Sequence, residues 1–172
     1  MQSRAKLLGH PIHQMLIVFP LGLLATSLVF DIIYLVSGNG RFADISFWMI
    51  VSGLIGALVA GVFGVIDFLA IPKRTRARRI GALHGIGNVL VVGLFAASWL
   101  IRRDAPIAPE GIAIVLSALG VALAVVTGWL GGELVDRLAV GVDPGAHSNS
   151  PSSLSRRPAS EHASPSSARV LP

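Results

Sequence analysis

Five ionisable side chains near the ends of long apolar runs carry chemistry that the rest of the chain lacks. His10 and His13 lie at the start of the first run, Asp67 and His84 flank a basic turn, and Glu133 follows the last run. Neutral imidazoles ligate haem iron, and imidazoles with carboxylates ligate divalent iron, zinc or manganese. These residue types predict a cofactor site if the fold brings them together.

Apolar runs of membrane-spanning length must position these residues. The runs cover about residues 15–36, 45–71, 80–101 and 111–132. Each is long enough for a helix to cross ~30 Å of hydrocarbon at ~1.5 Å per residue. Of the 172 residues, 53% are apolar and 13% are charged, whereas a soluble domain carries about 25% charged residues. The sequence therefore predicts an all-α membrane protein.

Short connections between the runs set the direction of the helices. Residues 37–44, 72–79 and 102–110 are turns rich in Gly, Pro or Arg, and such short connections join antiparallel neighbours. We therefore expect a four-helix antiparallel transmembrane bundle over residues 1–140. Within the first run, Pro20 predicts a kink or a break of the helix.

The distribution of Lys and Arg predicts the orientation of the bundle. Two lie near the N-terminus, five lie in the second turn and Arg137 follows the last run, whereas Arg41, Arg102 and Arg103 lie on the other side. Cytoplasmic loops carry the excess of Lys and Arg, so both termini are predicted to be cytoplasmic.

Residues 141–172 differ in kind from the runs. They are rich in Ser and Pro and show no apolar period. Such a composition does not bury enough surface to offset the entropy of ordering, so we expect a disordered cytoplasmic tail.

Several functional classes lack their signatures. The chain has no cysteine, which excludes disulfides, thiolate metal sites, iron–sulfur clusters and covalently attached haem. The G-x-S-x-G, H-E-x-x-H and P-loop motifs are also missing, so no catalytic residue is assigned. The basic run RTRARR lies between two spans, where it indicates orientation and attraction to anionic lipid rather than nucleic-acid binding.

In this topology all four helices bring a titratable side chain to a similar depth on the cytoplasmic side. Asp67 shares a helix face with Gly64 and Ala60, and His84 shares one with Asn88. Each has a simpler explanation: a pair with a base of the second turn, a bond to a neighbouring helix's carbonyl, or a place at the lipid interface. Convergence from four helices favours a shared site.

Asp31 lies outside this cluster, toward the opposite end of the first helix. A hydrogen bond to a hydroxyl group, or a pair with Arg41 or Arg102, would explain its presence in an apolar run. A second site or a proton path is the alternative.

Small residues recur four positions apart in three of the helices. Examples are Gly56, Ala60 and Gly64 in the second helix and Gly120, Ala124, Gly128 and Gly132 in the fourth. Such rows permit close helix packing, which is the simpler interpretation. A face flattened to admit a planar cofactor is the other.

Four stretches of the chain resemble a bacterial family. They are GHPIHQMLIVFPLG at the N-terminus and FGVIDFLAIP, GALHGIGN and TGWLGGELV at helix ends. Over about residues 8–142 the sequence is similar to the domain-of-unknown-function family 2231, predicted four-helix inner-membrane proteins. The resemblance implies a bacterial inner-membrane location and no reaction. The matching polar positions are His10, His13, Asp67, His84 and Glu133. The chain departs from the family pattern at Gln14 and at Asp136, which sets Asp136 aside as a site residue.

The first functional hypothesis is a cofactor-binding membrane protein for redox chemistry or sensing. His13 and His84 would ligate a b-type haem, with Trp129 and the glycine rows lining its ring. In a non-haem variant one or two divalent metal ions would be bound. The metal ligands would then be His10, His13, Asp67, His84 and Glu133.

Two other hypotheses stay open. A small transporter or proton-conducting subunit would use Asp67, His84 and Glu133 as an inner gate and Asp31 as an outer acid. A structural accessory subunit would use the polar cluster to lock the bundle. The expected partners are the lipid bilayer and either a second copy or another membrane subunit.

Overall fold

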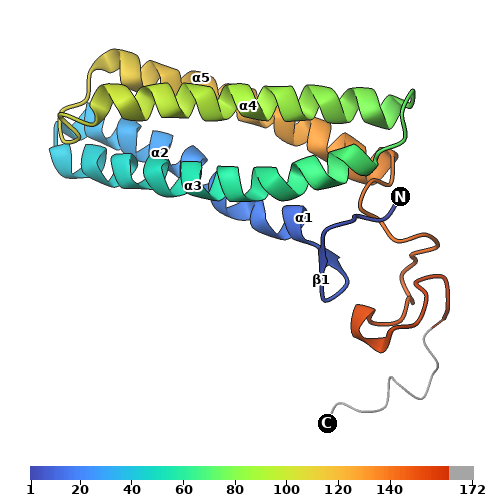
Figure 1. The fold of residues 1–172 in the computed structure, drawn as a ribbon. Coiled ribbons are helices and arrows are strands. Elements are labelled where there is room, and N and C mark those ends of the chain that lie inside the picture. Colours follow the sequence, from blue (N-terminus) through green and yellow to red (C-terminus); the bar gives the residue numbers. More distant parts are fainter. Residues whose placement is uncertain (163–172) are drawn as a thin grey trace, which may run out of the picture.

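In the computed structural model, which describes residues 1–162, four long helices run antiparallel (Figure 1). They are α2 (Val18–Ser37), α3 (Gly40–Ala70), α4 (Arg76–Arg102) and α5 (Gly111–Gly132). A short α1 (Ile12–Leu16) precedes α2, and a π-helical turn, η1 (Glu133–Arg137), extends α5. Four helical segments are long and apolar enough to cross a membrane. The predicted all-α four-helix fold is confirmed.

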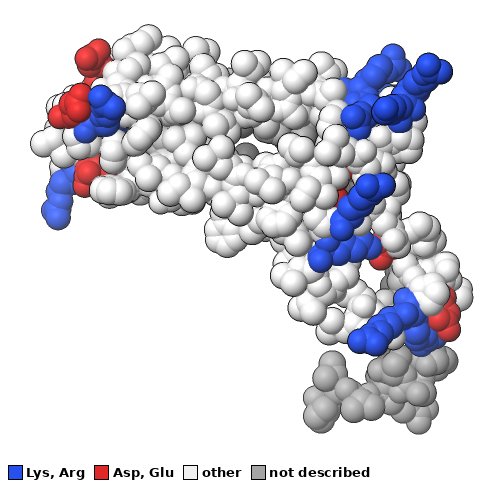
Figure 2. Space-filling view, viewed as in Figure 1, with Lys and Arg blue, Asp and Glu red and all other residues white. Residues whose placement is uncertain are grey.

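The helices occupy the corners of a square. α2 packs against α3 and α5, and α4 packs against the same two helices, so α2 and α4 are diagonally opposite. We call the end that carries the N-terminus, residues 71–75 and residues 133–137 the termini end, and the end with residues 38–39 and 103–110 the loop end. On the face shown in Figure 2, charged side chains gather at these two ends and leave the middle uncharged, as a membrane span requires.

Local capping signals set the helix boundaries. Gly38 adopts a left-handed φ of +67° and ends α2, and the Asn39 side chain accepts a hydrogen bond from the Arg41 backbone N–H to begin α3. The predicted turn at residues 37–44 therefore shortens to two residues. Thr75 caps α4 in the same way by accepting from the backbone N–H of Arg78.

The helix break predicted from Pro20 lies at Ile17, between α1 and α2. Proline has no N–H to donate to the carbonyl four residues earlier, that of Leu16, and its ring crowds that carbonyl. Pro20 itself packs beside Gly56 of α3. The break gives α1 its own direction, and α1 packs against α3.

The apolar core lies in the half of the bundle nearer the loop end. It consists of Leu24, Ile50, Val91 and Phe95, one or two from each of α2, α3 and α4. The ring of Phe95 approaches α5 so closely that a Cβ on Gly120 would lie 2.7 Å from it. In this half the small-residue rows serve close packing.

Two features at the termini end were not predicted from the sequence. Strands β1 (Lys6–Leu7) and β2 (His10–Pro11) pair as an antiparallel hairpin. A two-residue turn at Leu8 and Gly9, both with positive φ, joins them. The following tail contacts this hairpin, because the Ser153 hydroxyl donates to the Leu8 carbonyl.

Between residues 138 and 162 the chain forms turns and one short 3-10 helix, η2 (Ser153–Ser155). After η2, the Arg157 side chain donates to the Glu161 carboxylate at 2.8 Å. This bond lowers the pKa of the Glu161 carboxyl. The remaining ten residues of the tail predicted to be disordered lie outside the described residues.

Candidate functional site

Two histidines face each other across the diagonal of the bundle, in the half nearer the termini end. His13 comes from α1 and His84 from α4, and their ring centroids are 6.4 Å apart with the planes nearly perpendicular, at 89°. Both side chains are half-buried. Facing helices of a bundle commonly build cofactor sites in this way.

A neighbouring helix fixes each ring. Nδ1 of His13 lies 2.9 Å from the Ala60 carbonyl of α3, and Nδ1 of His84 lies 2.8 Å from the Thr127 carbonyl of α5. A carbonyl only accepts, so each Nδ1 is the donor, and Nε2 of each neutral ring is left as an acceptor. Metal-binding histidines typically use their second nitrogen in this arrangement.

The amide of Asn88 completes the surroundings of His84. Asn88 lies one turn further along α4, and its Nδ2 is 3.0 Å from Nε2 of His84. This bond confirms the helix face predicted for the two residues. The Nε2 of His84 therefore accepts from a side chain that lies on the same helix and can rotate away.

Glycines give the two rings their space. A Cβ on Gly64 would lie 3.0 Å from the His13 ring, and one on Gly131 would lie 3.2 Å from the His84 ring. Other glycines face open space, where an added Cβ would meet no atom within 4 Å. They include Gly61, Gly85 and Gly128. The small-residue rows thus divide into closely packed positions and open ones.

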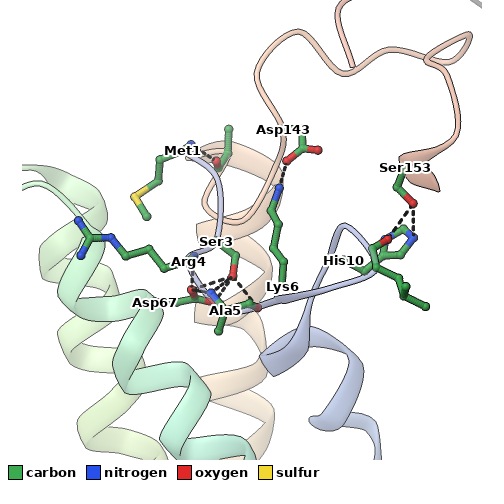
Figure 3. Close-up of polar contacts among 11 residues, drawn as sticks. Met1, Ser3, Arg4, Ala5, Lys6, His10, Asp67, Asp143 and Ser153 are labelled. Atoms are coloured by element: carbon green, nitrogen blue, oxygen red, sulfur yellow. Dashed lines mark hydrogen bonds and ion pairs between the residues drawn. The ribbon is translucent and has the colours of Figure 1, made fainter. Parts of the chain in front are cut away.

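Asp67 is held by the N-terminal segment and not by the histidines (Figure 3). The Ser3 Oγ lies 2.7 and 2.8 Å from the two carboxylate oxygens, and the backbone N–H of Arg4 donates to one of them at 2.8 Å. Both oxygens of Asp67 therefore have donors. The carboxylate anchors residues 3–5 against the end of α3, an explanation that differs from the predicted pair with a base of the second turn.

The other predicted site residues also lie apart from the pair. Glu133 forms an ion pair with Arg76, which joins the end of α5 to the start of α4. His10 is exposed in β2 beside Ser153, at 3.4 Å, and Trp129 is 66% exposed. Among residues 1–162, no three His, Asp or Glu side chains gather into a group that could hold a metal ion. Of the predicted set, the structure brings together His13 and His84.

The match to a known family agrees with this architecture. The family model described as "Predicted membrane protein (DUF2231)" matches residues 9–144. The chain belongs to this family. No curated protein and no solved structure matches the chain significantly. The DUF2231 region contains all four long helices and both facing histidines.

At its loop end the DUF2231 bundle holds a second polar set. Arg102 of α4 and Asp31 of α2 form two hydrogen bonds of 2.9 and 3.1 Å, and both side chains are 0% exposed. The guanidinium also donates to serines of α3, α4 and α5. These are Ser46, Ser98 and Ser117. One of the two pairs predicted for Asp31 is confirmed, and all four long helices contribute to the network.

The serines around Arg102 were not singled out from the sequence. Only Ser98 had a usable signal, because it precedes Arg102 by four positions in the same predicted helix. Residues four apart share a helix face. Arg102 is also a buried residue of α4 and not a loop base, so Arg41 and Arg103 alone remain on the loop side of the charge count.

Proposed function

We propose that this DUF2231 protein binds a b-type haem at its termini end, which His13 and His84 would hold, for electron transfer or redox sensing. The facing imidazoles carry the proposal, because each has Nδ1 bonded to a carbonyl and Nε2 left as an acceptor. The two ring centroids are 6.4 Å apart, so both imidazoles could reach the same iron.

The composition of the site favours haem over a free divalent ion. A carboxylate-assisted metal site would need Asp67 to leave Ser3 and Glu133 to leave Arg76. Haem iron takes axial imidazoles without carboxylates. When bound, haem would supply one-electron chemistry, and the chain's residues would orient the two rings through the Ala60 and Thr127 carbonyls.

The surroundings of the pair can adjust to a planar ring. Asn88 would turn away from Nε2 of His84. Gly64 and Gly131 border the two rings and place no side chain against either of them.

A proton path through one copy of the bundle is the weaker candidate. The buried cluster of Leu24, Ile50, Val91 and Phe95 lies between the histidines and the Asp31–Arg102 network along the helices. An apolar barrier of this kind offers a proton no hydrogen-bonding partner, so the cofactor role is favoured.

We further propose that the termini end faces the cytoplasm of a bacterial inner membrane. With Arg102 buried, the loop side carries even fewer free bases than the sequence suggested. A reporter fused within residues 38–40 should be active only outside the cytoplasm, and activity inside would reverse the assignment.

The visible absorption spectrum of the detergent-purified protein tests the haem proposal. We expect a Soret band in the air-oxidised protein and sharp bands after reduction with dithionite. Both should disappear in His13→Ala and His84→Ala and persist in the matched tail variant His147→Ala. A featureless spectrum from haem-replete cells, or bands that survive both substitutions, would overturn the proposal.

A further inference from the structure

A small cleft lies where α5 reaches the termini end. Neither His13 nor His84 lines it. Its volume is about 190 Å³. The lining residues are Trp129 and Gly132 of α5 and Glu133, Asp136 and Arg137 of η1. The last residue of this span is Arg137, so the cleft lies at the level where a membrane-spanning helix meets the aqueous phase.

The π-helical turn shapes the cleft. α5 ends at Gly132, and the wider turn η1 begins at the next residue. A Cβ on Gly132 would meet only the Asp136 carboxylate, at 4.0 Å, so the floor of the cleft carries no side chain. Single π-helical turns are rare and frequently accompany functional sites.

The charges of the cleft form a zwitterionic pattern. Glu133 is neutralised by Arg76. Asp136 and Arg137 are neighbours, both are exposed, and within residues 1–162 neither has an ion-pair partner. One free carboxylate and one free guanidinium thus stand side by side at the membrane boundary.

An apolar surface continues from the cleft toward the middle of the membrane. Trp129 is 66% exposed, and Val125 and Val126, one turn earlier on the same face, are 69% and 55% exposed. Tryptophan at a membrane interface typically lies among lipid head groups, and its ring face attracts ammonium cations.

We propose that this cleft binds a phospholipid whose head group carries a primary amine, of the phosphatidylethanolamine type. The phosphate accepts from the Arg137 guanidinium, and the ammonium donates to the Asp136 carboxylate beside the Trp129 ring. The acyl chains follow Val125 and Val126. The site is independent of haem, because it shares no residue with the histidine pair.

The chemistry distinguishes this lipid from its common relatives. A primary ammonium has N–H groups to donate to Asp136, whereas the quaternary ammonium of phosphatidylcholine has none. Phosphatidylglycerol has no cation, and its negative head group would lie against the free carboxylate. The loss of one charge-assisted hydrogen bond at an exposed site predicts about a five- to tenfold preference for the primary amine.

Native mass spectrometry of the full chain in detergent tests the proposal. The protein is titrated with phosphatidylethanolamine, phosphatidylcholine and phosphatidylglycerol of identical acyl chains. We expect the wild type to retain the ethanolamine lipid about five- to tenfold better than the choline lipid. Asp136→Asn should abolish this preference, Asp136→Glu should keep it, and Arg137→Gln should weaken binding of all three lipids.

The matched control is Asp104→Asn, an exposed aspartate at the loop end that should leave the lipid preference unchanged. Circular dichroism of each variant checks that the helices are intact. Equal retention of the ethanolamine and choline lipids by the wild type, or a preference that survives Asp136→Asn, would overturn the proposal.

Discussion

The two ends of the bundle treat their polar side chains in opposite ways. At the loop end, Asp31 and Arg102 are fully buried and bind each other and three serines. At the termini end, His13 and His84 are half-buried. Nε2 of His13 has no hydrogen-bond partner among the described residues, and Nε2 of His84 accepts from the Asn88 amide alone. A buried ion pair that all four helices surround specifies the structure, whereas a histidine with an acceptor to spare is suited to a ligand.

The largest loss of stability is expected when the loop-end network is broken. Asp31→Ala should destabilise the protein by about 3–5 kcal/mol, because it leaves the Arg102 guanidinium buried without its counter-ion. Unfolding by SDS in mixed micelles measures the change. In the double variant Asp31→Ala/Arg102→Met most of the loss should be recovered, since no buried charge remains. A single variant as stable as the wild type would show that the pair is not structural.

A smaller change in stability is expected from alanine substitutions of glycines, and it should differ between closely packed and open positions. Gly120→Ala should destabilise the protein by about 1–3 kcal/mol, because the new Cβ would overlap the Phe95 ring. Gly128→Ala, on the same helix two turns away, meets no neighbour and should stabilise the protein by up to about 1 kcal/mol, because alanine favours the helix. The same unfolding assay compares them, and equal losses would contradict the division into packed and open rows.

The smallest expected effect concerns the N-terminal segment. Asp67→Ala removes the acceptor for Ser3 and Arg4, so amide hydrogen exchange at residues 3–5 should accelerate. Global stability should fall by only about 1 kcal/mol, because these contacts hold the terminal segment and not the packed helices. Asp67→Asn, which keeps one acceptor oxygen, should give an intermediate exchange rate. Unchanged exchange in both variants would mean that Asp67 does not anchor the segment.

Helical periodicity accounts for what the sequence predicted well. The spans and the shared face of His84 and Asn88 follow from residues placed on regular helices. Arg102 was one of the two bases predicted to pair with Asp31. The break near Pro20 follows from the same geometry, because the missing N–H falls at a fixed position.

The structure departs from the expected site mainly where the chain is not helical. Asp67 binds residues 3–5, whose extended path has no periodic signal. His10 separates from His13 because α1 begins at Ile12 and the preceding residues form a hairpin instead. The predicted metal set assumed that similar depth in the membrane brings side chains together, whereas Asp67 and Glu133 each have a nearer partner.

The loop-end ion pair also has a consequence for biosynthesis. Its two residues are 71 positions apart in the chain. At a synthesis rate of about 5–20 residues per second, Asp31 is made roughly 4–14 s before Arg102. During that interval the first two helices hold an unpaired carboxylate in or near lipid, with Ser46 the one network serine already made. The nascent chain thus depends on the arrival of α4 to become fully membrane-compatible.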